Sequence, residues 1–217
     1  MDNNVNAFAT GSEIARDLLD AKAIKLSLDK PFQWSSGWHS PIYCDNRVTL
    51  SYPDIRRKIK DRLCDLVKKH FSSADAIAGV ATAGIPQGAL IADQLNLPFL
   101  YVRSKPKGHG MENLIEGRME KGARIVVVED LISTGGSSLK AIEALRNNGA
   151  EVLGLVAIFS YGFDLAAQNF KDSNVAIQYL SDYNYLLEEA LKLNYIAEEQ
   201  LESLESWRKD PAGWAGF

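Results

Sequence analysis

The sequence of 217 residues is 46% hydrophobic and 24% charged, and its formal net charge is -4 at pH 7. These values are typical of a single soluble globular domain, and the lack of a basic face or tail argues against a nucleic-acid-binding protein. Charged residues near the amino terminus and glycines in the longest uncharged stretch argue against a signal peptide and a membrane span. Two widely spaced cysteines favour reduced thiols. We therefore expect a cytoplasmic protein.

The amino-terminal part combines one helix with an aromatic segment. Residues 12–23 have the spacing of an amphipathic helix, for which Ser12 is the expected cap. Residues 32–47 are rich in aromatic and turn-forming residues and include a short apolar strand at 42–44. The aromatic rings are suited to stacking on a flat molecule, and Arg47 is suited to pairing with a carboxylate. The alternative is that the aromatics fill a small subdomain and that Arg47 is a surface residue.

The rest of the chain alternates strands with helices. A long amphipathic helix begins at Pro53, and its many basic residues are expected on its solvated side. This alternation favours a three-layer α/β fold with a mostly parallel, five-stranded sheet. The strands are expected at 76–80, 98–102, 125–128, 151–159 and 175–180, and two closing helices at 183–193 and 197–209.

Two connections between these elements are suited to binding anions. The turn at 81–86 is small and tight, so its backbone amides could face an anion, although a plain connection explains it as well. The segment 103–117 is long and contains glycines and the basic residues Arg103, Lys105, Lys107 and His109. A basic loop at the end of a strand suggests a mobile lid that closes over a polyphosphate. A β-hairpin with solvated charges is the alternative.

The most informative stretch is 125–138. A buried β-branched strand is followed by Glu129 and Asp130, then by a turn of hydroxyls and glycines at 133–138, and then by a helix. This order places the acids and the turn at the carboxyl end of the strand, where open α/β sheets bind ligands. Glycines and a helix start favour a phosphate, and two carboxylates favour a vicinal diol or a divalent cation. A ribose 5-phosphate satisfies this layout; an ordinary capped helix with solvated acids is the alternative.

The stretch 125–138 resembles the phosphoribosyl diphosphate (PRPP) motif of the type I phosphoribosyltransferases. Together with the segments 40–47 and 103–110, it makes the whole chain similar to the orotate phosphoribosyltransferases. The resemblance implies the type I fold in one domain (1–217), with a small amino-terminal hood at about 1–48, a core at 52–180 and carboxyl-terminal helices at 183–209. It also implies transfer of the phosphoribosyl group from PRPP to orotate, which gives orotidine 5′-monophosphate and pyrophosphate in pyrimidine biosynthesis.

The resemblance further implies Mg²⁺, held mainly through PRPP, and a homodimer in which loop 103–117 completes the neighbour's site. It assigns Arg103, Lys107 and His109 to the diphosphate as catalytic groups, and Ser133 to both PRPP and orotate. The implied PRPP-binding set is Arg103, Lys107, His109, Glu129, Asp130, Leu131, Ile132, Ser133, Thr134, Gly135, Gly136 and Ser137.

The chain departs from the family at several positions. Many members have lysine where this chain has Ser35, Ala83 and Ser104, and an arginine for orotate where it has Tyr161. We therefore expect Mg²⁺, Lys105 and the loop to balance more of the diphosphate charge. For the same reason, Arg47 becomes the candidate partner of the orotate carboxylate.

Two other functions remain to be weighed. A purine phosphoribosyltransferase on the same fold is one, and the loop and the segment 45–47 argue against it because they are similar to those of the orotate enzymes. A PRPP-sensing regulator without turnover is the other, and the missing basic face argues against it.

Overall fold

The structure is a computed structural model that describes residues 2–34, 37–105 and 114–214. Three predictions, those at Ser35, Lys107 and His109, lie outside the described residues. Within the described part of the chain, no helix is both long enough and apolar enough to cross a membrane.

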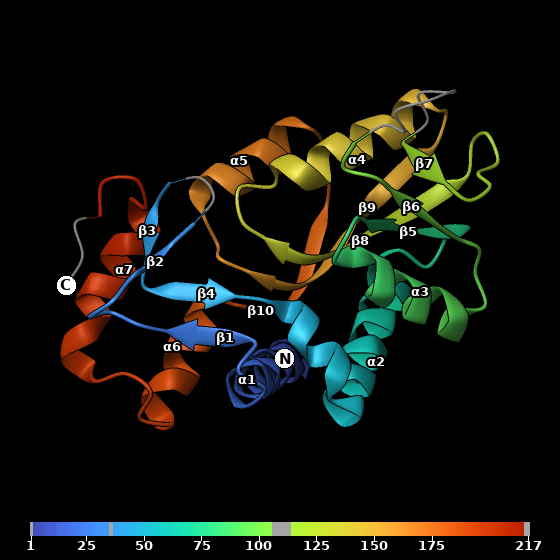
Figure 1. Ribbon diagram of the computed structural model, residues 1–217. Helices are drawn as coiled ribbons and strands as arrows, with labels where there is room; N and C mark the ends of the chain where they lie inside the picture. The colour runs from blue at the N-terminus through green and yellow to red at the C-terminus, as the bar shows by residue number, and fades with distance from the viewer. Residues whose placement is uncertain (1, 35–36, 106–113, 215–217) are drawn as a thin grey trace.

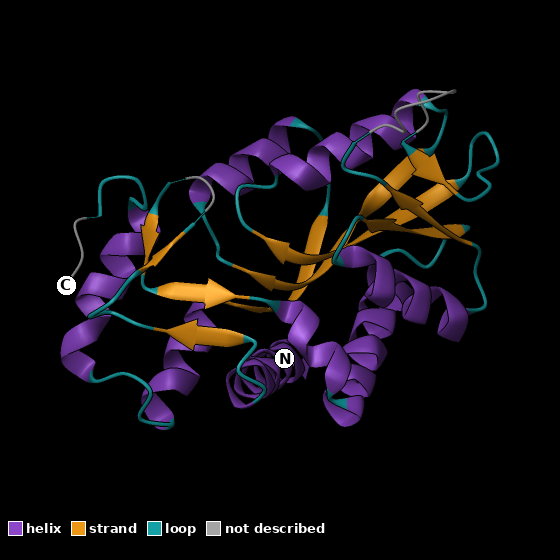
Figure 2. Cartoon of the chain, viewed as in Figure 1, coloured by secondary structure: helices purple, strands orange, loops and turns teal. Residues whose placement is uncertain are grey.

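The core is a six-stranded sheet in the order β10-β9-β8-β5-β6-β7 (Figures 1 and 2). All neighbouring strands are parallel except β7, which pairs antiparallel with β6. Five of the strands are those expected from the sequence, and β7 is a short sixth at the edge. The strands are β5 (Ala76–Val80), β6 (Phe99–Val102), β7 (Ile115–Glu116), β8 (Arg124–Ile132), β9 (Glu151–Ser160) and β10 (Ile177–Asp182).

Strand β8 is central because its β-branched residues are buried on both faces. Residues 125–128 have no exposed surface, as expected for a parallel strand covered by helices. The strand continues past its expected end at Val128, since Glu129 pairs with Ala157 and Ile132 pairs with Ser160 of β9. The two acids therefore belong to the last part of the strand, which fixes their backbone.

Helices cover both faces of the sheet. On one face lie α1 (Asp2–Asp20), α2 (Pro53–His70) and α3 (Gly84–Leu95), and on the other lie α4 (Gly136–Asn147) and α5 (Asp164–Asp172), as Figure 1 shows. The fold is thus the expected three-layer α/β arrangement. Helix α1 begins at Asp2, so Ser12 lies inside it and is not its cap. Helix α5 was not expected from the sequence.

Small elements from both ends of the chain meet beside the sheet. Strand β1 (Ile24–Leu26) pairs with β4 (Ile42–Cys44), and β2 (Phe32–Gln33) pairs with β3 (His39–Ser40), both antiparallel. The carboxyl-terminal helices lie next to them in Figure 1. The division into hood, core and carboxyl-terminal helices stays a prediction, and α1 itself packs on β10 and α6. The remaining elements are the 3-10 helices η1 (Asn46–Ser51) and η2 (Glu198–Gln200), and the helices α6 (Tyr183–Lys192) and α7 (Leu201–Lys209).

Candidate active site

A cavity of about 290 Å³ lies at the carboxyl ends of β5 and β8. It combines the acids that end β8, the turn that follows them and the tight turn after β5. The Ala81–Thr82 peptide bond in that second turn is cis. The expectation that both turns share one crevice is therefore met, and this favours the anion-binding role of the turn at 81–83. The lining residues are Ala81, Thr82, Ala83, Glu129, Asp130, Leu131, Ser133, Thr134, Gly135, Gly136, Ser137 and Ser138.

The turn between β8 and α4 has the geometry of a phosphate cradle. Gly135 has a φ of +83°, a left-handed conformation that favours glycine, and α4 begins at the next residue. The amino terminus of α4 has no side-chain cap, so its first backbone N–H groups face the cavity with the positive end of the helix dipole. Asn169 of α5 donates to the Thr134 carbonyl at 2.9 Å and so holds the turn from behind.

Of the two adjacent acids, Glu129 is buried and Asp130 is half-buried. Glu129 is 6% exposed and accepts a hydrogen bond from the Ser138 hydroxyl at 3.2 Å. Burial, together with the charge of Asp130, raises the pKa of the Glu129 carboxyl well above its ordinary value. Burial also raises the pKa of Asp130. Such a pair is stabilised by a ligand that donates hydrogen bonds or carries positive charge, because either relieves the repulsion between the carboxylates.

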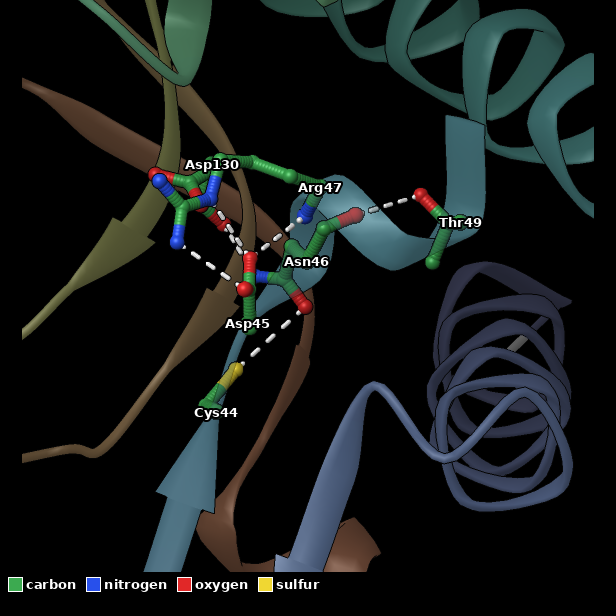
Figure 3. A network of polar contacts seen from close by, with 6 residues as sticks. All are labelled: Cys44, Asp45, Asn46, Arg47, Thr49 and Asp130. Atoms are coloured by element: carbon green, nitrogen blue, oxygen red, sulfur yellow. Dashed lines mark hydrogen bonds and ion pairs between the residues drawn. The ribbon is translucent and has the colours of Figure 1, made fainter. Parts of the chain in front are cut away.

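A polar network ties the segment 45–47 to these acids (Figure 3). The buried Asn46 donates from Nδ2 to the Asp130 carbonyl at 2.8 Å. The Arg47 guanidinium donates to both carboxylate oxygens of Asp45, at 2.6 and 2.9 Å, and extends beside the Asp130 carboxylate. Its charge lowers the pKa of Asp130 and so partly offsets the effect of burial. The segment 45–47 thus holds the backbone of Asp130 through Asn46 and lowers the pKa of its carboxyl through Arg47.

A second cavity, of about 570 Å³, adjoins the first. Three residues that follow the acids, Leu131, Ser133 and Thr134, line both cavities. Aromatic rings dominate the second one, and the rings of Trp34 and Tyr161 lie 5.0 Å apart between centroids. The site therefore consists of a polar, phosphate-type cavity beside an aromatic cavity suited to a flat heterocycle. The second cavity is lined by Gln33, Trp34, Trp38, Tyr43, Cys44, Leu131, Ser133, Thr134 and Tyr161.

The structure brings most of the expected residues together, with three differences. Arg103 pairs with Glu116 of β7 at 3.4 Å, at the base of the loop. Arg47 is bound to Asp45, and its side chain is 56% exposed. Ile132 is fully buried in the core and does not border either cavity.

Sequence reasoning assigned no role to three residues that the fold brings to the site: Gln33, Cys44 and Asn46. Gln33 and Cys44 line the aromatic cavity, and Asn46 holds the backbone of Asp130. Asn46 directly precedes Arg47 and lies within the segment 45–47 that carries the resemblance, so its position was a signal. No local pattern distinguished the other two.

Comparison with known proteins identifies the family. Residues 51–185 match the family described as phosphoribosyl transferase domain. The chain is 57% identical to the orotate phosphoribosyltransferase of Cytophaga hutchinsonii over 202 residues, which are 93% of this chain and 97% of that protein. It is 59% identical to that of Bacteroides fragilis over 200 residues, or 92% and 94%. The chain belongs to the orotate phosphoribosyltransferase family.

A solved member of this family has the same fold. The orotate phosphoribosyltransferase of Aeropyrum pernix superposes with a TM-score of 0.75 at 32% identity, and covers 85% of this chain and 99% of its own. The match at 51–185 includes the acids, both turns and Tyr161. The aromatic residues of 32–44 and helix α7 lie outside it. The matched domain, 51–185, thus carries the phosphate-type cavity, whereas several residues that line the aromatic cavity precede it.

Proposed function

We infer that this phosphoribosyltransferase transfers the 5-phosphoribosyl group from PRPP to orotate, and that it releases pyrophosphate and forms orotidine 5′-monophosphate. The observation that carries this function is identity of 57% and 59% to orotate phosphoribosyltransferases over more than nine-tenths of the chain. The two adjoining cavities support it, because a sugar phosphate and a flat base need to meet at one point.

The polar cavity is the proposed site of the phosphoribosyl group. The 5′-phosphate lies in the turn 133–137, where backbone N–H groups, hydroxyls and the helix dipole are directed at one anion. The ribose hydroxyls face Glu129 and Asp130 and donate hydrogen bonds to their carboxylates. These bonds compensate for the cost of ionising two carboxyls that are largely removed from water, a cost that the free protein does not offset.

The aromatic cavity is the proposed site of orotate. Trp34 and Tyr161 line this cavity and supply aromatic contact for the flat pyrimidine, and the proposed contact of Ser133 with both orotate and PRPP is supported by its place in the lining of both cavities. Arg47 is the proposed partner of the orotate carboxylate. Its position supports this role, since it follows closely on Tyr43 and Cys44 in the cavity wall and lies beside Asp130.

The diphosphate is the most highly charged part of PRPP, and two positions at which many family members have lysine carry no charge in this chain. Ala83 borders the cavity without a charge, and Ser104 is exposed. The proposed compensation comes from Arg103, Lys105, Lys107 and His109, with Mg²⁺ bound mainly through PRPP. The carboxylates of the site fit such an ion, because Mg²⁺ prefers oxygen ligands and neutralises phosphate charge when bound.

The reaction requires positioning more than covalent chemistry. As the bond between C1 of the ribose and the diphosphate breaks, the sugar acquires oxocarbenium character and a ring nitrogen of orotate attacks it. The buried carboxylates stabilise the developing positive charge, and the aromatic wall holds the base in line. The loop cations neutralise the leaving group. Closure of the loop excludes the water that would hydrolyse the sugar cation.

The proposed assembly is a homodimer in which loop 103–117 reaches the neighbour's site. The hairpin formed by β6 and β7 supports this, because β7, the strand that follows the loop, lies at the edge of the sheet. The proposed location is the cytoplasm, where Cys44 and Cys64 stay free thiols.

A spectrophotometric assay tests the function. Purified protein is mixed with PRPP, Mg²⁺ and either orotate, hypoxanthine or uracil, and the loss of base absorbance is followed with and without a chelator. Magnesium-dependent turnover of orotate alone is the expected result. Turnover of hypoxanthine would instead favour a purine enzyme, and tight PRPP binding without turnover of any base would favour a regulator.

A further inference from the structure

Trp207 of α7 is fully buried directly behind the aromatic cavity. Its indole Nε1 donates to the carbonyl of His39 in β3 at 3.1 Å, which ties the carboxyl-terminal helix to the amino-terminal segment. Tyr183 adds a second tie, because its hydroxyl donates to the Leu204 carbonyl of the same helix at 3.0 Å. The indole is therefore held at a fixed place relative to both ends of the chain.

The rings of the cavity wall pack on this indole. The Trp207 ring meets Trp34 edge-on at 5.6 Å and 82°, and meets Tyr161 edge-on at 5.8 Å and 78°. It also contacts Phe163, whose ring stacks on Tyr161. Trp34 and Tyr161 both line the cavity, whereas Trp207 does not. Edge-to-face contacts of this kind fix the angle of a ring as well as its position.

We propose that Trp207 is a positioning residue for the base: it holds Trp34 and Tyr161 at the angle at which they receive the heterocycle. This inference rests on the proposed function. Trp34 comes from the amino-terminal segment and Tyr161 directly follows β9; the two rings contact each other, and a group that contacts both from behind sets their common orientation. The indole occupies that position, and removing it leaves a space into which both rings can turn.

The effect is specific to the base because neither Trp207 nor the rings that it contacts line the phosphoribosyl cavity. Its acids, turns and helix start belong to β8, α4 and the connection between β5 and α3. Loss of Trp207 therefore weakens the binding of orotate and leaves that of PRPP unchanged. A residue that only anchors α7 for stability has no such preference.

The experiment measures KM for orotate and for PRPP in Trp207→Phe, Trp207→Leu and Trp207→Ala. The matched control is Leu204→Ala, which removes an equally buried side chain from the same helix. We expect Trp207→Ala to raise the orotate KM on the order of tenfold or more with the PRPP KM within about twofold of wild type. Trp207→Phe restores an aromatic edge and returns the orotate KM most of the way, and Leu204→Ala changes neither constant.

If the wild-type protein turns over orotate, either of two outcomes overturns the inference. One is an orotate KM that stays within about twofold of wild type in a folded Trp207→Ala, and the other is an equal rise in both constants, also seen in Leu204→Ala. If Trp207→Ala does not fold, Trp207→Leu replaces it in the comparison with Trp207→Phe. A wild-type protein without orotate turnover would instead refute the proposed function.

Discussion

Glu129 and Asp130 lower the free energy of unfolding of the ligand-free protein when they are ionised. Two adjacent carboxyls, one buried and one half-buried, are held at the cavity because strand β8 continues through them. Ionising them there costs more than in the unfolded chain, since burial raises the pKa of both. The protein thus keeps a destabilising pair in place for its ligand.

We predict that Glu129→Gln stabilises the free protein at neutral pH and impairs catalysis. Because the folded-state pKa of Glu129 is raised, the folded protein binds more protons than the unfolded chain between the two pKa values, so this group lowers stability as the pH rises through that window. Removing the charge should raise Tm by about 2–4 °C at about pH 8, and by less near the ordinary pKa of a carboxyl. kcat/KM for PRPP should fall on the order of tenfold or more. Thermal melts at several pH values and steady-state kinetics measure both; a lower Tm at pH 8 would contradict the account.

Arg47 is predicted to act on orotate. Arg47→Ala should raise the orotate KM on the order of tenfold, as for loss of a charged hydrogen bond, with the PRPP KM little changed. Asp45→Asn serves as the control, because it breaks the ion pair and leaves the guanidinium in place. If Arg47 serves only to lower the pKa of Asp130, the PRPP constant will move instead, and the assignment to orotate is wrong.

At the scale of elements, the connection from β8 to α4 depends on one backbone conformation. A Cβ on Gly135 would lie 2.7 Å from the Phe170 ring, in addition to the strain of its positive φ. A Cβ on the next residue, Gly136, would meet nothing closer than 4.0 Å. A substitution at Gly136 is therefore a matched control for the same substitution at Gly135.

We predict that Gly135→Ala lowers the free energy of unfolding by at least about 1 kcal/mol and raises the PRPP KM, because the turn has to move away from its phosphate-binding shape. Gly136→Ala should change stability by less than about 0.5 kcal/mol. Denaturant titrations and PRPP kinetics of the two variants provide the comparison. Equal losses of stability in both variants would show that the positive φ of Gly135 and its contact with Phe170 are not the cause.

The loop between β6 and β7 is proposed to neutralise the leaving group. Lys107→Ala should lower kcat on the order of a hundredfold, as for loss of an electrostatic transition-state group, with Tm unchanged. Steady-state kinetics with saturating PRPP and a thermal melt check this. A change confined to KM would mean that the lysine binds ground and transition states equally.

At the scale of the whole molecule, the proposed exchange of loops between subunits has a quantitative consequence. Lys107→Ala and Glu129→Gln each damage every site of a homodimer. In a mixed dimer, one site combines the intact acids of one subunit with the intact loop of the other, and the second site carries both defects. Random mixing should therefore restore about a quarter of wild-type activity.

This mixing experiment uses subunits exchanged under mild denaturation, with each variant refolded alone as the control. Recovery near the predicted level supports a loop that acts across the interface. Activity no higher than the sum of the two separate variants would place the loop over its own subunit's site.

The sequence predicted more of the polar cavity than of the aromatic cavity. The strand, the acids, the turn and the helix start of the phosphoribosyl cavity are consecutive, so period, composition and order were enough to predict them. Strands β5 and β6 were also predicted, because each is an apolar run in a chain that alternates strands with helices. Strand β7 and helix α5 were missed because they are short, and α5 shows only Ala166 and Phe170 as its buried pair.

What the sequence determined alone is therefore the chemistry that lies within single segments: the parallel sheet, the paired acids and the phosphate cradle of 125–138. Tertiary structure decided the aromatic cavity, where side chains that precede η1, such as Trp34 and Tyr43, meet Tyr161 and the residues after Asp130, with Trp207 behind them. It also decided that Asn46 fixes Asp130 and that Arg47 pairs with Asp45. The physical reason is that ring packing and side-chain hydrogen bonds between distant segments depend on how layers pack, and no local periodicity encodes that packing.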